Sequence, residues 1–129
     1  MKLTRLFVLC LALTALVACQ EEEPPNCRPN TYGIYSSPNL TNGTFEADVQ
    51  EGAGEKGVIV VFTDKNAAGA VNTSATATGE LDESCTTLTI PEQQVGTQTS
   101  SGTFAVTSTQ MSGNVKIDQL TLTLVLTKQ

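Results

Sequence analysis

Few side chains in this sequence could carry chemistry. It has four cysteines but no histidine and no tryptophan. Without an imidazole, neither a Ser–His–Asp triad nor a Cys–His pair can be assembled. The remaining candidates are the carboxylate cluster Glu80, Asp82 and Glu83 and the run from Asp64 to Gly69, which combines one carboxylate with Asn66. These two segments decide whether an acid–base or metal site is expected.

Both segments are better explained as hydrated turns than as sites. The cluster at 80–83 could hold Ca²⁺ or supply the paired acids of a glycoside hydrolase. The run at 64–69 has the first spacings of a calcium loop, but Ala68 occupies its third ligand position and Ala75 the place of its closing glutamate. We therefore predict no metal, no cofactor and no enzymatic activity. A carboxylate-dependent hydrolase is the least favoured function.

The overall charge argues against a nucleic-acid partner. The full chain carries 7 lysines and arginines against 13 acidic residues, a net charge of −6 at pH 7. An acidic surface repels a phosphate backbone. The length of 129 residues fits one domain.

The first residues have the pattern of a secretory signal. Lys2 and Arg5 precede an apolar run from Leu6 to Val17. As a helix this run would span about 18 Å, which is too short for a hydrocarbon core of about 30 Å. A basic start followed by a short apolar run is typical of a signal peptide. We therefore predict that residues 1–18 are removed from the mature protein.

The end of this segment, Leu16-Val17-Ala18-Cys19, resembles the lipobox of bacterial lipoproteins. The resemblance implies a diacylglyceryl group on the Cys19 sulfur, cleavage after Ala18 and acylation of the new amino terminus. Two or three acyl chains would hold the protein at a membrane without a spanning segment. The alternatives are a transmembrane anchor and a general signal-peptidase site with a chance cysteine.

Residues 19–26 are then a tether that starts at the lipidated Cys19. This segment contains Glu21 to Glu23 and two prolines. An acidic cluster directly after the lipidated cysteine is similar to the export signal of surface lipoproteins in one group of Gram-negative bacteria. A hydrated, stiffened spacer explains the same residues, and both roles are compatible. We expect a lipid anchor at the outer membrane and leave open whether the domain faces the periplasm or the cell surface.

The lipoprotein resemblance leaves two cysteines for the folded domain. Cys10 would be lost with the signal peptide, and Cys19 would carry lipid. An exported domain meets an oxidising compartment, where an even pair of cysteines tends to join. We therefore predict a disulfide between Cys27 and Cys85.

Residues 27–129 are predicted to form one all-β domain. Segment 44–50 alternates strictly between apolar and polar residues, and segment 58–63 is a continuous β-branched run. Further short strands are predicted at 31–36, 73–78, 86–90, 103–107 and 114–128. Turn-rich clusters separate them, including an Asn-Gly pair at 42–43 and a Ser-Gly-Asn cluster at 112–114. The pattern favours an antiparallel barrel, flattened barrel or sandwich of about 7–8 strands.

The last segment changes its pattern part-way. Val115 and Ile117 occupy odd positions, whereas the leucines from Leu120 to Leu126 occupy even positions. Because side chains alternate between the faces of a strand, the parity must switch near residues 118–119. We predict a β-bulge or a tight break there.

The C-terminal third is similar to small lipocalin-like, or calycin-type, lipoprotein domains. The similarity rests on Leu88-Thr-Ile-Pro-Glu-Gln-Gln-Val95, Gly102-Thr-Phe104 and Ser112-Gly-Asn114 before a Thr/Leu strand. In those domains a strand ending Ile-Pro-x-Gln leads to a Gly-rich hairpin and a terminal strand. The resemblance implies a barrel or flattened barrel, and it leaves open whether the barrel holds a cavity.

Two functions remain for such a domain. The favoured one is a non-enzymatic accessory lipoprotein that binds an envelope protein or serves as a structural component. The alternative is a lipocalin-like carrier of a small apolar ligand. Its cavity would be lined by Phe45, Val60, Phe62, Phe104 and Leu122. Whether the barrel interior is open or filled distinguishes the two functions, and the oligomeric state is left open.

Overall fold

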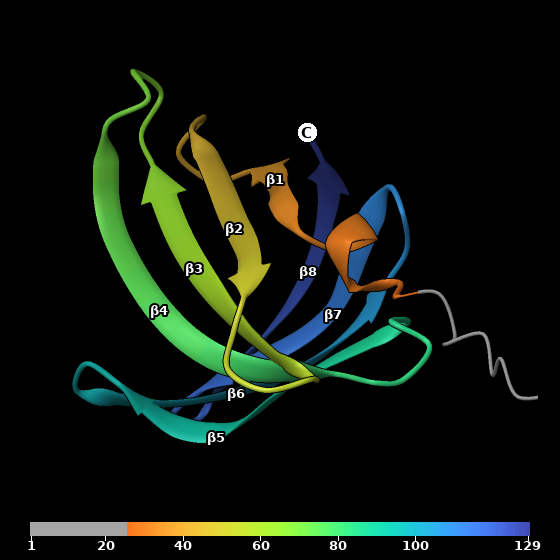
Figure 1. Cartoon of the computed structure of the whole chain (residues 1–129). Helices are drawn as coiled ribbons and strands as arrows, with labels where there is room; N and C mark the ends of the chain where they lie inside the picture. Colours follow the sequence, from red (N-terminus) through yellow and green to blue (C-terminus); the bar gives the residue numbers. More distant parts are fainter. Residues whose placement is uncertain (1–25) are drawn as a thin grey trace, which may run out of the picture.

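The computed structural model describes residues 26–129, which form a closed antiparallel barrel with each strand paired to the next along the chain (Figure 1). A 3-10 turn, η1 (Arg28–Asn30), precedes the first strand. The strands are β1 (Gly33–Pro38), β2 (Thr44–Glu51), β3 (Gly57–Lys65), β4 (Val71–Leu81), β5 (Thr87–Val95), β6 (Gln98–Val106), β7 (Gln110–Ile117) and β8 (Leu120–Lys128). The predicted all-β fold is confirmed as a barrel of eight strands. The predictions for the signal peptide and for Cys19 lie outside the described residues.

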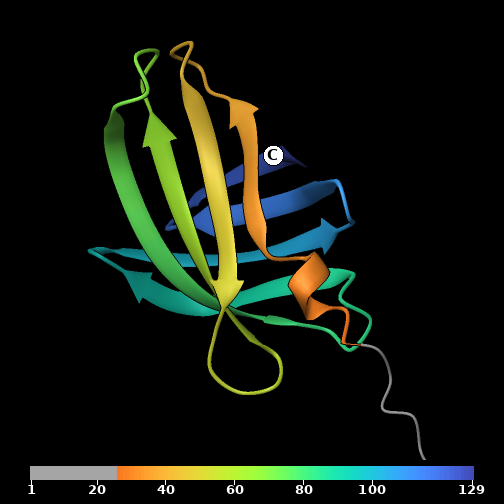
Figure 2. The ribbon, with the colours of Figure 1, turned by 45° about the horizontal axis from the view of Figure 1, so that its top comes forward.

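The barrel is flattened, with one narrow end and one wide end. β4 and β5 share only two residue pairs, one of which is Leu81 opposite Leu88. β1 and β8 also share only two, one of which is Tyr35 opposite Lys128. The strands thus form two groups, β1–β4 and β5–β8, which are joined here and run in different directions in Figure 2. We call this the narrow end; it carries η1 and the β2–β3, β4–β5 and β6–β7 loops. The wide end carries the other four loops.

A glutamine side chain bridges β4 and β5 where their backbones no longer pair. The β5 ladder shifts register between Ile90 and Gln93, around Pro91, which has no N–H to donate. The Gln93 amide accepts from the Thr78 N–H at 2.9 Å and donates to the Thr78 carbonyl at 2.7 Å. It therefore takes the place of a peptide group in the ladder. This is the Gln of the Ile-Pro-x-Gln run.

The hydrophobic core fills the narrow half. Alternate residues of each strand face inward, as the period of two requires. The largest fully buried side chains are Tyr35, Val58, Val60, Leu81, Leu88, Phe104, Met111 and Leu126. Tyr35 is fixed by its hydroxyl, which donates to the Thr31 carbonyl at 2.8 Å. Burial raises the pKa of that hydroxyl.

One predicted turn is wrong, and one predicted break is right. The cluster at 112–114 lies inside β7. Its glycine provides space, because a Cβ on Gly113 would lie 2.0 Å from the Thr103 carbonyl oxygen and 2.7 Å from the Phe104 Cα. The parity switch is a tight hairpin between β7 and β8, where Asp118 has a φ of 52°.

The predicted disulfide closes the narrow end. Cys27 is bonded to Cys85, and their Cα atoms lie 6.0 Å apart. The bond joins the segment before η1 to the β4–β5 loop. Next to it, the Arg28 guanidinium donates to the carbonyls of Gly54 and Gly57 at the β2–β3 connection. The start of the described chain is thus fixed to two loops of the narrow end.

Candidate ligand cavity

The wide half of the barrel contains a cavity of about 600 Å³. This volume is typical of small-molecule sites, which span about 300 to 1,000 Å³. All eight strands and the β1–β2 loop contribute to it. The lining residues are Ser37, Pro38, Asn39, Leu40, Thr41, Phe45, Phe62, Asp64, Thr73, Ala75, Ala77, Ile90, Val95, Gln98, Ser100, Val115, Ile117, Leu122, Thr123 and Leu124. The barrel interior is therefore filled at one end and open at the other.

The cavity is open because small side chains face inward in this half. Ala75 and Ala77 come from β4, and Ser37 and Ser100 come from β1 and β6. Side chains of this size cannot reach across the interior. In the narrow half, larger residues such as Phe104 fill the equivalent space. The Thr/Ala alternation of β4, a weak strand signal, thus sets the width of the cavity.

An aromatic pair forms part of the apolar wall. Phe45 on β2 and Phe62 on β3 stack with ring centroids 5.9 Å apart and an interplanar angle of 24°. Phe62 also lies 6.5 Å from the ring of Phe104, which is fully buried. On β8, Leu122 lines the cavity and is 39% exposed. The wall is therefore an apolar surface that a ligand can reach.

Polar side chains shape the mouth of the cavity. Asp64, near the end of β3, accepts from the Asn39 side-chain amide at 2.7 Å and from the Asn72 amide at 3.1 Å. Asn39 also donates to the Lys65 carbonyl at 2.8 Å. Its own side-chain oxygen accepts from the Gly43 N–H at 2.7 Å. These bonds connect the β1–β2 loop and β4 to the end of β3.

The structure divides the predicted cavity residues between the two halves. Phe45, Phe62 and Leu122 line the cavity. Val60 and Phe104 also face the interior, but both are fully buried in the narrow half. Sequence reasoning missed further lining residues, of which Asp64, Val95, Ser100, Ile117 and Leu124 are examples. Four of the five continue the inward alternation of their strands toward the wide end, whereas Val95 faces inward because the register shift between Ile90 and Gln93 switches the parity of β5.

The acidic cluster at 80–83 does not converge on one point. Asp82 caps the β4–β5 loop by accepting from the Thr87 N–H at 3.0 Å and the Thr86 N–H at 2.8 Å. The bond from Thr87, together with the contacts of Ser84 and Thr86, lowers the pKa of Asp82 to about 2. Glu83 pairs instead with Lys56 in solvent, at 3.3 Å. Within residues 26–129, no group of three or more acidic or cysteine side chains is placed to hold a metal ion.

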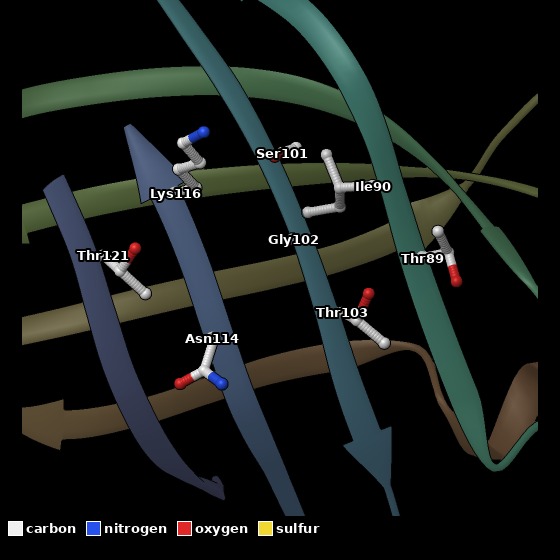
Figure 3. Close-up of a pocket in the computed structure, with 8 residues that line it drawn as sticks. All are labelled: Thr89, Ile90, Ser101, Gly102, Thr103, Asn114, Lys116 and Thr121. Carbon is white, nitrogen blue, oxygen red and sulfur yellow. The ribbon is translucent and has the colours of Figure 1, made fainter. Parts of the chain in front are cut away.

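A second hollow lies over β5–β8, and Figure 3 shows its lining. Its volume is about 310 Å³, and it is more open to solvent than the barrel cavity. The residues that line it are Thr89, Ile90, Ser101, Gly102, Thr103, Asn114, Lys116 and Thr121. Most of them are polar, so this hollow offers little apolar surface to a ligand. The barrel cavity is the stronger candidate site.

Comparison with known proteins adds no family to this description. No protein-family model, curated protein or solved structure matches the chain. Within the described part of the chain, no helix is long and apolar enough to cross a membrane. The geometry of the barrel is therefore the basis for inferring the function.

Proposed function

We propose that this protein is a binding protein that holds a small, largely apolar ligand in the open half of its barrel. The observation that carries the proposal is the cavity of about 600 Å³ with its reachable apolar wall. A purely structural domain of this size gains stability by filling its interior. Leaving apolar side chains such as Leu122 reachable by water forgoes that gain. The open interior thus favours the carrier over the accessory protein without a ligand.

The experiment places a large side chain inside or outside the cavity at neighbouring positions of β4. Ala75 lines the cavity, whereas Thr76 faces outward and is exposed. We expect Ala75→Trp to weaken the binding of a neutral apolar dye such as Nile red at least tenfold, because the indole occupies the ligand volume. Thr76→Trp should bind the dye like the unsubstituted protein.

Both variants carry an internal control. The chain has no tryptophan of its own, so the introduced indole alone reports its surroundings. Its emission should be shifted to the blue in Ala75→Trp relative to Thr76→Trp, and circular dichroism should show the same β content in both. The proposal fails if the unsubstituted protein binds no apolar probe, or if both variants bind the dye equally well.

The anchor is a separate part of the proposal. We propose that Cys19 is lipidated and holds the barrel at the outer membrane, on the support of the lipobox-like run 16–19. The chain enters the barrel at the narrow end, where Cys27 is bonded to Cys85. An anchor at Cys19 would therefore be attached to the end of the barrel opposite the mouth of the cavity.

Lipidation at Cys19 predicts that a variant without this thiol loses both its lipid label and its membrane attachment. Replacing Cys19 with serine should abolish incorporation of labelled palmitate and release the protein from the membrane fraction. Cys10→Ser should leave both unchanged, because that residue would be removed with the signal peptide. Membrane retention of Cys19→Ser with undiminished labelling would refute lipidation at this cysteine.

A further inference from the structure

We infer that the cavity takes a cationic amphiphile, with its apolar body against the aromatic wall and its amine at Asp64. The inference rests on the proposed function and adds the chemical class of the ligand. It starts from the position of one carboxylate. Asp64 lines the cavity, two residues beyond Phe62 on β3 and opposite Phe45 on β2. A ligand packed against the two rings would therefore place its polar end beside Asp64.

The carboxylate of Asp64 keeps free acceptor capacity. One oxygen accepts from Asn39 and the other from Asn72. An ionised carboxylate offers about four acceptor positions, so each oxygen can accept a further bond. Both donors are neutral amides, and they orient the group without cancelling its charge. Lys65, the next residue, pairs instead with Glu46 at 2.7 Å.

No basic side chain balances this charge within the cavity. Among the lining residues that the structure describes, Asp64 is the only charged one. Residues 26–129 contain five basic and ten acidic side chains. Three of the five basic residues, Arg28, Lys56 and Lys128, lie at the narrow end, where they contact η1 or its neighbouring loops. The other two, Lys65 and Lys116, lie toward the wide end but outside the cavity lining, so the charge that faces the apolar interior is that of Asp64.

This arrangement discriminates between polar headgroups. An ammonium group would gain a charge-assisted hydrogen bond to Asp64, and such bonds are stronger than neutral ones. The carboxylate of a fatty acid would meet a like charge and no basic partner. A neutral hydroxyl would neither gain a charge-assisted bond nor be repelled, so its affinity should be intermediate. The apolar wall alone would hold all three with similar affinity.

The experiment compares three ligands with the same chain: decylamine, decanol and decanoate. Each displaces Nile red from the full protein, kept in a non-ionic amphipol and below the micelle concentration of each ligand. We expect decylamine to bind about tenfold more tightly than decanol, as a single charge pair at a partly hydrated mouth implies. Decanoate should bind more weakly than decanol, and added salt should narrow both differences.

Two aspartate variants distinguish a direct contact between the amine and Asp64 from a general attraction to the acidic protein. Asp64→Asn keeps the shape of the side chain and should remove the preference for the amine. Asp118→Asn is the matched control, because Asp118 lies in the β7–β8 hairpin at the same end but outside the cavity lining. It should keep most of the preference. Retention of the full preference in Asp64→Asn would overturn the inference.

The ligand series also separates this inference from the proposed function. If decanoate binds as tightly as decylamine, and Ala75→Trp weakens both, the cavity binds ligands but the amine assignment is wrong. If none of the three ligands displaces a dye whose binding Ala75→Trp weakens, the inference fails and the proposed function stands. If the unsubstituted protein binds no dye, both fail together. Tighter binding of the amine, sensitive to Asp64→Asn and to Ala75→Trp, supports both.

Discussion

Replacing Cys27 and Cys85 with serine should lower the free energy of unfolding by about 3 to 4 kcal/mol. The two cysteines are 58 residues apart in the sequence, and closing a loop of this length is worth about 4 kcal/mol in the chain-entropy description. Cys85 is buried, at 7% exposure, so its replacement also disturbs packing at the narrow end. Urea denaturation of the double variant and of the oxidised parent, followed by circular dichroism, measures the difference.

The same variant tests the independence of the two ends. The disulfide closes the narrow end, whereas the cavity opens at the other end of the strands. Below its unfolding transition, the double variant should therefore bind Nile red with nearly the parent affinity. A loss below about 1 kcal/mol on removing the bridge would show that the reduced chain is already constrained in the unfolded state. A loss of dye affinity at full folding would contradict the separation of the two ends.

The positions of most strands follow from local sequence. The alternation at 44–50 matches β2, and the β-branched run at 58–63 lies inside β3. These signals are strong because burial on one face of each strand selects alternate side chains. The strands in segment 91–102 are harder to predict from the sequence, because Pro91 and a register shift interrupt the ladder there. In that region β4 and β5 are joined by hydrogen bonds from the Gln93 side chain. The alternation of apolar and polar residues does not predict such bonds.

The cavity was only partly predictable, for a different physical reason. Alternation shows which residues face the interior, and it placed Phe45 and Phe62 correctly on that face. It does not show which end of the barrel is filled, because that depends on side chains that meet from distant strands. Val60 and Phe104 have the same inward parity but meet large partners in the narrow half. Asp64 has the same parity as Val60 and Phe62, but its polar character fits the turn predicted at 64–69, so the sequence assigns it to that turn and not to the interior.

The two halves of the interior should respond differently to the same substitution. Phe104 is fully buried in the packed half, so Phe104→Ala leaves a new void and should cost about 3 to 5 kcal/mol of unfolding free energy. Phe45 lines a cavity that is already open. Its replacement by alanine enlarges an existing space and removes less buried area, so we expect a loss of about 1 to 2 kcal/mol.

The affinity for Nile red should respond in the opposite order, with the larger loss at position 45. Phe45→Ala removes half of the aromatic pair and should weaken dye binding several-fold, whereas Phe104 lies beside Phe62 and is not among the residues that line the cavity. Where Phe104→Ala does not fold, Phe104→Leu keeps part of the volume and should bind the dye nearly as well as the parent. Equal stability losses at positions 45 and 104 would mean that the wide half is packed in solution. That result would remove the basis for a ligand, because a filled barrel gains through its own side chains the burial that an open one gains from its occupant.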